Sequence, residues 1–343
     1  MRDPSFWWRK RSLLTLLLSP LGAIYGLVAA LRLRGGDSVG IPVICVGNLT
    51  VGGAGKTPTA LAIGRYLIAI GARPYFLSRG YGGSLSGPVR VDLIKHRADE
   101  VGDEPLLLAQ LCPTIVSADR LAGARAARDA GATVIVMDDG FQNPSLRKDL
   151  ALIVVDGRRG IGNGYVLPAG PLRAPLKRQL RRAQALLVVG PGDGAARVID
   201  EARGRNLPVF RGKLAANPAA AWALAGQRVV AYAGIGDPEK FFATVTAAGI
   251  VARVRLPYPD HYRYRRSDAS KILAHTSHGD LQLLTTEKDL ARMKNDPEVS
   301  ELAGRSKTLP VALTLDDDEA FKQWLFAVLP SAGPLAATAP ATS

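Results

Sequence analysis

The sequence predicts an α/β fold with two domains of unequal size, preceded by a long apolar helix. Three observations carry this prediction. Short apolar runs alternate with segments of helical spacing over most of the chain, which is typical of a parallel sheet covered by helices on both faces. A second series of the same kind begins near Arg228. No residue from Ser12 to Leu31 carries a charge, which indicates a helix long enough for a bilayer core.

These patterns divide the chain into four parts. We expect an N-terminal membrane-associated helix in 1–34, a larger domain in 35–215, a smaller α/β domain that completes a cleft in 216–330, and a disordered tail in 331–343. The tail is rich in Ala and Pro, a composition that does not support a packed core.

The apolar N-terminal segment has several possible structures. Residues 13–31 would form a helix of roughly 28 Å, close to the thickness of a bilayer core. Basic residues flank both ends, so they give no clear orientation, and Pro20 interrupts the run. A cleaved signal peptide, a spanning helix and a buried soluble helix are the alternatives. We favour a helix or helical hairpin lying in the inner leaflet, with its basic flanks attracted to anionic lipid.

A glycine-rich loop follows the first predicted strand of the larger domain. The apolar run 41–46 predicts a strand and 58–70 predicts a helix, which is the context of a phosphate-binding loop. Thr50 stands where that motif usually begins with Gly. Lys56 would reach the β- and γ-phosphates of a nucleotide and Thr57 would bind Mg²⁺. The predicted nucleotide-binding residues are Thr50, Val51, Gly52, Gly53, Ala54, Gly55, Lys56 and Thr57.

The rest of the larger domain alternates strands with helices. Together with the loop, this alternation predicts a parallel sheet like that of P-loop NTPases. The predicted elements are strands at 73–78, 133–137, 150–155 and 185–189 and helices at 105–111 and 121–130.

Three carboxylates in this domain are candidates for chemistry. Asp138 and Asp139 end the strand 133–137, where a carboxylate usually binds the Mg²⁺ of a nucleotide. Asp103 precedes the helix at 105–111, and its spacing alone favours the N-cap of that helix. The functional alternative is a general base near the γ-phosphate.

The smaller domain contributes one conspicuous histidine. His261 follows Asp260 in a segment rich in basic residues. Residues 228–250 read as strand, turn and helix, and "LQLLTTEKDLARM" and "TLPVALTL" supply the later elements. Glu287, Lys288 and Asp289 follow a strand, where a loop would face the cleft between the domains.

Charge restricts the partners. The net charge of +14 favours an acidic partner, such as nucleic acid, an anionic membrane or a phosphorylated substrate. Few aromatic residues interleave the basic runs and the sequence has no nucleic-acid-binding motif, so we expect no nucleic acid partner. The two cysteines, Cys45 and Cys112, are consistent with buried free thiols in a reducing compartment.

Eight ordered motifs resemble one family. They are "GNLTVGGAGKTP", "LSRGYGG", "GDEP", "DDGFQN", "LPAGPLR", "AGIGDP", "PDHYRY" and "TTEKD". In this order they resemble the tetraacyldisaccharide 4′-kinases of lipid A biosynthesis, from the N-terminal helix to about residue 315. The loop of that family also lacks the first Gly, so Thr50 fits its pattern.

The resemblance implies an ATP- and Mg²⁺-dependent kinase. It would transfer the γ-phosphate to the 4′-hydroxyl of tetraacyldisaccharide 1-phosphate, giving lipid IVA. The enzyme would be a monomer, peripheral or monotopic on the cytoplasmic face of the bacterial inner membrane, with the lipid A disaccharide precursor as its partner.

The resemblance also assigns roles to residues. It makes Asp103 the base, paired with His261 across the cleft, and we expect domain closure with substrate to bring the two together. Lys56 would be the third catalytic residue, and Thr57, Asp138 and Asp139 would serve the metal. The predicted substrate-binding residues are Asn48, Ser78, Arg79, Tyr81, Gln142 and Arg173.

Two positions depart from the family pattern. Asn143 stands where the family has His, and Ala174 where it has Glu. The alternative from another class is a P-loop nucleotide switch or a metallochaperone GTPase at the membrane. That class is favoured by an Asn-Lys-x-Asp motif for the base, which the sequence lacks.

Overall fold

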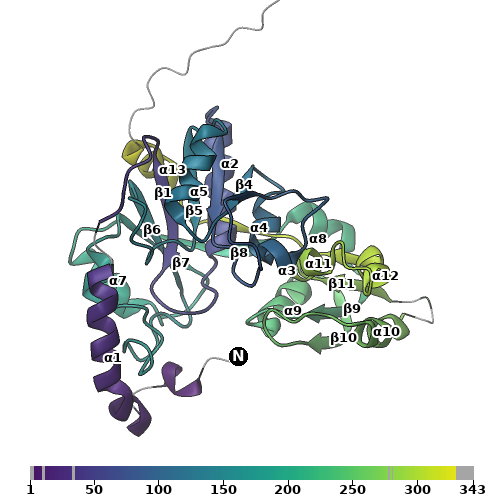
Figure 1. Cartoon of the computed structure of the whole chain (residues 1–343). Coiled ribbons are helices and arrows are strands. Elements are labelled where there is room, and N and C mark those ends of the chain that lie inside the picture. The colour runs from purple at the N-terminus through teal and green to yellow at the C-terminus, as the bar shows by residue number, and fades with distance from the viewer. Residues whose placement is uncertain (1–3, 10–11, 33–34, 277–278, 280, 330–343) are drawn as a thin grey trace, which may run out of the picture.

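The computed structural model describes residues 4–9, 12–32, 35–276, 279 and 281–329. The predicted tail at 331–343 lies outside the described residues, as do basic residues 10, 11 and 34 beside the N-terminal helix. Figure 1 shows a large α/β body, a smaller one beside it, and the N-terminal helix along the flank of the larger body. The predicted α/β fold with an N-terminal helix is confirmed.

The larger body is built on a nine-stranded sheet. Its central strands are parallel, and only the two edge strands, β3 and β13, run antiparallel to their neighbours. In spatial order the strands are β13 (Val311–Leu315), β8 (Val209–Ala216), β7 (Ala185–Val189), β6 (Leu150–Asp156), β1 (Val43–Asn48), β5 (Val134–Asp138), β2 (Pro74–Ser78), β4 (Thr114–Val116) and β3 (Val89–Arg90).

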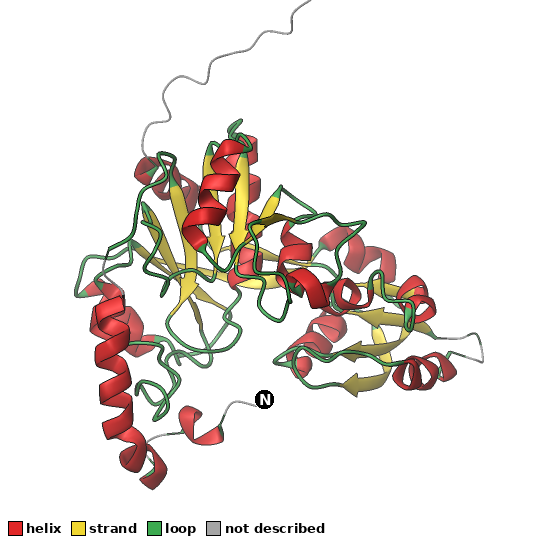
Figure 2. Ribbon diagram, viewed as in Figure 1, coloured by secondary structure: helices red, strands yellow, loops and turns green. Residues whose placement is uncertain are grey.

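Helices cover both faces of this sheet, as Figure 2 shows. One face packs against α2 (Lys56–Ala69) and α13 (Asp318–Val328). The other face packs against α5 (Arg120–Asp129), α6 (Leu176–Leu180) and α7 (Ala196–Arg203). Because the central strands are covered on both sides, all residues of β1, β2, β5 and β7 are buried, which explains their unbroken apolar runs.

Most predicted elements are confirmed with small shifts at their ends. The predicted strands at 73–78, 133–137, 150–155 and 185–189 are β2, β5, β6 and β7. The helix predicted at 105–111 is α4 (Asp103–Leu108), which follows the short α3 (Ala98–Val101).

The smaller body has a four-stranded parallel sheet. Its strands lie in the order β10 (Val251–Pro257), β9 (Arg228–Ala233), β11 (Gln282–Thr285) and β12 (Ser306–Thr308). The helices of this part of the chain are α8 (Pro218–Leu224), α9 (Pro238–Ala247), α10 (Arg266–Ala274), α11 (Glu287–Met293) and α12 (Ser300–Arg305).

The end of the described chain returns to the larger sheet. Strand β13 pairs with β8, and α13 buries Phe321 and Leu325 in the core beside α2. The domain boundaries 35–215 and 216–330 stay predictions. The segment "TLPVALTL" was expected in the smaller domain, but only its first residue belongs to the smaller sheet, and its last five residues form β13 of the larger sheet. Aromatic packing accompanies this pairing: Phe321 of α13 lies edge-on to Phe210 of β8 at 5.1 Å between ring centroids.

The N-terminal segment forms one continuous helix, α1 (Leu13–Arg32), after the short η1 (Ser5–Trp8). Gly22 and Gly26 face the segment 165–175 of the larger body, where a Cβ on Gly22 would lie 2.8 Å from the Val166 carbonyl oxygen. Trp7 Nε1 donates to the Pro168 carbonyl at 3.0 Å. Small residues therefore let α1 dock closely on one side, despite the Pro20 inside it.

The other sides of α1 are apolar and uncovered. By length and composition, Leu13–Leu31 is able to cross a membrane, and only 17% of it is buried. Leu13, Leu17, Ile24 and Leu27 are each more than three-fifths exposed. This exposure contradicts the alternative of a buried soluble helix, and the single helix contradicts the hairpin.

The docking of α13 has a testable energetic consequence. We expect Phe321→Ala to lower the free energy of unfolding by about 3–5 kcal/mol, because it empties a fully buried site. Trp222→Ala is the matched control, since Trp222 is 84% exposed and its loss should change stability by about 0.5 kcal/mol or less. Chemical denaturation of the detergent-solubilised protein measures both, and equal stabilities would contradict this packing.

Candidate active site

The loop between β1 and α2 has the geometry of a phosphate cradle. Gly52 and Gly55 have φ values of 98° and 91°, a region that glycine adopts without strain. Gly55 is the N-cap of α2 and has no side chain to cap it, so the first N–H groups of α2 are available to a ligand. Lys56 Nζ lies 3.4 Å from the Gly52 carbonyl oxygen, which folds the lysine back over the loop.

Asp138 meets this loop because β5 is the neighbour of β1 in the sheet. Thr57 Oγ1 donates to Asp138 Oδ2 at 2.9 Å. Burial raises the pKa of Asp138 to about 6, against the opposing charge of Lys56. The second oxygen, Oδ1, is buried and has no hydrogen-bond partner among the described residues. A buried, unpaired carboxylate oxygen beside a threonine hydroxyl is suited to a divalent cation.

Asp139 is engaged differently. Arg173 donates to both of its oxygens, at 2.9 and 3.1 Å, and Lys56 Nζ lies 3.6 Å from Oδ2. Burial would raise the pKa of Asp139, but Lys56 and Arg173 outweigh it and hold the pKa below its usual value. Burial also lowers the pKa of Lys56, although Asp139 opposes that change.

The predicted substrate residues Asn48, Gln142 and Arg173 bind the phosphate loop and the strand before it. Arg173 Nε donates to the Thr50 carbonyl at 3.1 Å, and Asn48 Nδ2 donates to the Gly52 carbonyl at 3.0 Å. Gln142 Nε2 donates to the Asn48 carbonyl at 2.9 Å. The buried Gln179, which the sequence analysis did not identify, accepts a second hydrogen bond from Gln142 at 3.0 Å.

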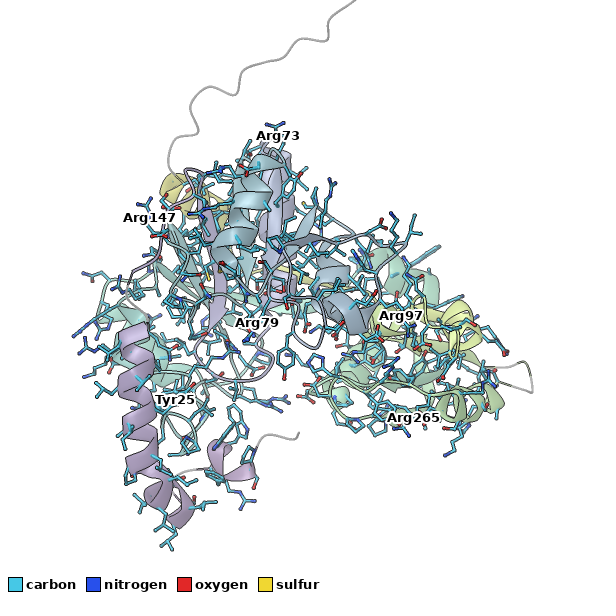
Figure 3. All side chains as sticks on the ribbon, viewed as in Figure 1. Tyr25, Arg73, Arg79, Arg97, Arg147 and Arg265 are labelled. Atoms are coloured by element: carbon cyan, nitrogen blue, oxygen red, sulfur yellow. The ribbon has the colours of Figure 1, made fainter. Side chains whose placement is uncertain are left out.

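The other predicted substrate residues lie after β2. Ser78 is buried and accepts a long hydrogen bond of 3.4 Å from the Gly80 N–H. Arg79 is exposed, and Figure 3 labels it. Tyr81 is 68% exposed, and its ring centroid lies 5.7 Å from that of His261. Tyr81 therefore borders the same space as the histidine.

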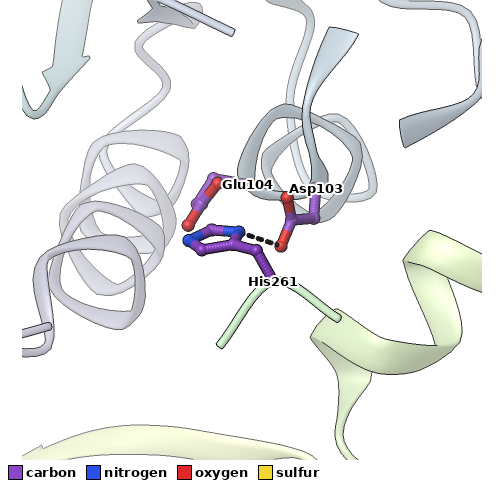
Figure 4. A group of neighbouring side chains, drawn as sticks. All are labelled: Asp103, Glu104 and His261. Atoms are coloured by element: carbon purple, nitrogen blue, oxygen red, sulfur yellow. Dashed lines mark ion pairs between the residues drawn. The ribbon is translucent and has the colours of Figure 1, made fainter. Parts of the chain in front are cut away.

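Asp103 and His261 meet across the two bodies. His261 Nδ1 lies 3.3 Å from Asp103 Oδ2 (Figure 4). The contact is formed in this structure, and its dependence on substrate-driven closure stays a prediction. The N-cap interpretation of Asp103 is wrong, because Gly102 is the N-cap of α4 and the Asp103 carboxylate points to His261 and Arg292.

Arg292 is a neighbour that the sequence analysis did not identify. Its Nε and Nη2 donate to Asp103 Oδ2 at 2.9 and 2.7 Å. Burial would raise the pKa of Asp103, but His261 and Arg292 outweigh it and hold the pKa well below its usual range. The hydrogen bond to Asp103 raises the pKa of His261. The sequence analysis expected a loop at Glu287–Asp289 facing the cleft, whereas the structure has the helix α11 there. Arg292 lies one helical turn after Lys288, a spacing that only the helix makes significant.

Asp103, Glu104 and His261 have ligand atoms within 4.8 Å of one another (Figure 4), a spacing that suits a metal. Protein cations already occupy this place. Lys288 Nζ lies 2.7 Å from Glu104 Oε1, and Arg292 pairs with Asp103. The cluster is therefore a charge-balanced ion-pair network.

The two positions that depart from the family pattern, Asn143 and Ala174, each make hydrogen bonds with nearby residues. Asn143 Oδ1 accepts hydrogen bonds from the N–H of Ser145 at 3.1 Å and from its hydroxyl at 2.8 Å. Ala174 is fully buried, and its carbonyl accepts from Gln179 at 2.7 Å. The Asn143 contacts form a turn and require no titrating group.

Comparison with known proteins identifies close relatives. The family model "Tetraacyldisaccharide-1-P 4′-kinase" matches residues 14–330. The tetraacyldisaccharide 4′-kinase of Rhodopseudomonas palustris strain BisA53 is 53% identical over 333 residues, which cover 97% of each chain. That of Methylobacterium sp. strain 4-46 is 52% identical over 322 residues, covering 93% of this chain and 95% of its own.

A solved structure is also similar. The crystal structure of LpxK from Aquifex aeolicus in complex with ATP has a TM-score of 0.71 at 27% sequence identity. The match covers 93% of this chain and 100% of that one.

The arginine that clamps the phosphate loop is open to test. We expect Arg173→Lys to weaken ATP binding about tenfold, because lysine keeps the charge but is unable to hold both Asp139 oxygens and the Thr50 carbonyl. Arg178→Lys, at an exposed position on α6, is the matched control. Titration calorimetry with MgATP measures both dissociation constants, and an unchanged value for Arg173→Lys would show that the clamp is dispensable.

Proposed function

The chain belongs to the tetraacyldisaccharide-1-phosphate 4′-kinase family, and we propose that it phosphorylates the 4′-hydroxyl of tetraacyldisaccharide 1-phosphate with ATP, forming lipid IVA. The observation that carries the proposal is the pairing of Asp103 with His261 beside a phosphate loop. Helix α4, which begins at Asp103, packs against α2, which follows the phosphate loop: Leu108 and Ile63 lie in one buried cluster. Nucleotide and acceptor would therefore share one cleft.

The reaction is an in-line phosphoryl transfer. The 4′-oxygen forms a bond to the γ-phosphorus while the bond from that phosphorus to the β,γ-bridging oxygen breaks, and ADP leaves. Lys56 neutralises the charge that grows on the β- and γ-phosphate oxygens. Asp103 accepts the proton of the 4′-hydroxyl, and His261 holds Asp103 in its ionised form.

The residues present fit a Mg²⁺ ion beside the nucleotide. Thr57 and Asp138 would hold it, because Asp138 Oδ1 is buried without a partner among the described residues. Bound there, Mg²⁺ would neutralise phosphate charge. We assign Asp139 to holding Lys56 and Arg173 in place, since both of its oxygens are already paired.

We further propose that α1 associates with the inner membrane on its cytoplasmic face. One side of α1 docks on segment 165–175, and the remaining sides present leucine and isoleucine to the surroundings. The net charge of +14 favours an anionic surface and an anionic lipid acceptor. The acyl chains of the acceptor would stay in the bilayer during transfer. The monomeric state and the lack of a nucleic acid partner stay predictions.

The comparisons do not favour the alternative, a nucleotide switch or metallochaperone GTPase, since the family model and the similar relatives are named as tetraacyldisaccharide 4′-kinases. A carboxylate base serves an attacking hydroxyl or an attacking water, so the reaction product separates the two classes: phosphate on the lipid, or free phosphate.

Asp103→Asn tests the proposed reaction. We expect transfer of phosphate from ATP to tetraacyldisaccharide 1-phosphate to fall by roughly 10²–10⁴-fold, because the amide does not accept the hydroxyl proton. The KM for ATP should change little, since the phosphate loop is intact. Lipid product is measured by chromatography of radiolabelled phosphate. Full activity of Asp103→Asn, or ATP hydrolysis without lipid product in the wild type, would refute the proposal.

The exposed side of α1 generates a second test. We expect the triple variant Leu17→Gln, Ile24→Gln, Leu27→Gln to bind anionic vesicles at least about tenfold more weakly, since burying one such side chain is worth roughly 1.5–3 kcal/mol. Trp222→Gln, which alters an exposed apolar residue on α8, should bind like the wild type. Vesicle flotation measures both, and unchanged flotation of the triple variant would locate the membrane contact elsewhere.

A further inference from the structure

The guanidinium of Arg292 joins the two bodies at the catalytic carboxylate. Its side chain is 8% exposed and lies on α11, in the smaller body, whereas Asp103 begins α4 in the larger one. Nε and Nη2 donate to Asp103, while Nη1 donates to the Gly234 carbonyl at 2.7 Å and to Asp289 Oδ1 at 2.8 Å. All three nitrogen atoms of the guanidinium therefore donate hydrogen bonds.

A second layer of hydrogen bonds holds Arg292 in this position. Asp289 is fully buried and accepts from the Gly234 N–H at 3.1 Å and from the Tyr264 hydroxyl at 3.1 Å. The Thr286 hydroxyl donates to its other oxygen at 2.6 Å. Three separate segments of the smaller body therefore determine where the guanidinium points.

The contacts of the Asp103 carboxylate fall on one of its two oxygen atoms. Among the described residues, every hydrogen bond and ion pair of the carboxylate ends on Oδ2, from Arg292 or from His261. Two cationic neighbours on one oxygen fix the plane of the carboxylate. The oxygen Oδ1 is left to accept from a further donor.

We propose that Arg292 is a positioning residue for phosphoryl transfer, which orients Asp103 so that Oδ1 accepts the proton of the acceptor hydroxyl. This inference rests on the proposed function. In this role Arg292 contacts neither the substrate nor the reacting atoms. It acts only through Asp103, which His261 contacts as well.

The physical reason for an arginine here is orientation. A carboxylate paired with a guanidinium is a weak base, so Arg292 would not be selected to strengthen the base. In a loose phosphoryl-transfer transition state the acceptor hydroxyl loses its proton late, and alignment matters more than basicity. The planar guanidinium fixes direction as well as charge, whereas an ammonium supplies charge alone.

The experiment compares Arg292→Met and Arg292→Lys with the wild-type full-length chain. We expect Arg292→Met to lower kcat about 10²-fold, the usual cost of a misplaced catalytic group, with the KM for ATP unchanged. The acid limb of the kcat profile should move to higher pH, because removing a cation raises the pKa of Asp103. Arg292→Lys should restore the acid limb and only part of kcat.

The other charged groups that face Asp103 stay in place in these variants. They are His261 from the loop after β10, Lys288 from α11 and Glu104 from α4. A shift of the acid limb between the wild type and Arg292→Met is therefore caused by the loss of the Arg292 charge.

The matched control is Arg263→Met. Arg263 Nη2 forms another of the ion pairs between the bodies, 3.2 Å from Asp99 Oδ2, but its side chain is exposed and makes no ion pair with Asp103. We expect this variant to retain wild-type kcat and an unshifted acid limb. An equal loss of kcat in Arg263→Met would assign the effect to weaker contact between the bodies and overturn the inference.

The remaining outcomes separate this inference from the proposed function. An active wild type with an equally active Arg292→Met would overturn the positioning role alone. A wild type that makes no lipid product would overturn the proposed function and the inference with it. If Arg292→Met does not fold, Arg292→Lys tests the inference instead. A wild-type kcat in Arg292→Lys would show that the guanidinium is not required to orient Asp103.

Discussion

The parallel pairing of β1 with β5 is the constraint on which the rest of the site depends. Val46 lies opposite Asp138 in this register, so the end of β1, where the phosphate loop begins, is adjacent to the end of β5. Parallel strands place their carboxyl ends at one edge of the sheet. The hydroxyl of Thr57 therefore reaches Asp138, and Lys56 reaches Asp139, without any unusual backbone except the positive φ of Asp139, 53°. A slip in this register would separate the loop from both carboxylates.

The segment 165–175 connects this edge to the apolar helix α1. Its Pro171 carbonyl accepts from the Val51 N–H at 3.0 Å, and Arg173 clamps Thr50 and Asp139. The same segment receives Trp7 and the glycines of α1. A single stretch of chain therefore contacts both the phosphate loop and the helix that we propose to bind lipid, so the loop is held at a defined place relative to that helix.

The second half of the site depends on contact between the two bodies. Asp103 belongs to the larger body, but both groups that determine its charge and orientation, His261 and Arg292, belong to the smaller one. Burying either charge without its partner is unfavourable. A buried carboxylate without a nearby cation would take up a proton, and a buried guanidinium without a nearby carboxylate would have no opposite charge to offset its lost hydration. Together they stabilise one another, so the geometry of the candidate site depends on how the two bodies are arranged.

The sequence by itself determined the local features of this protein. The glycines of the loop, the buried strands and the uncharged run before residue 32 each follow from neighbours in the chain, and they predicted β1, α2 and α1 correctly. Motif order indicated the family and the pairing of Asp103 with His261. Only the tertiary structure decided that Asn48 and Gln142 support the loop, that Asp103 is no helix cap, that β13 returns to the larger sheet, and that Arg292 pairs with Asp103. These are contacts between segments up to 189 residues apart. Hydrophobic periodicity reports which face of an element is buried, but not against which distant partner, and that choice depends on side-chain shape and charge in the folded state.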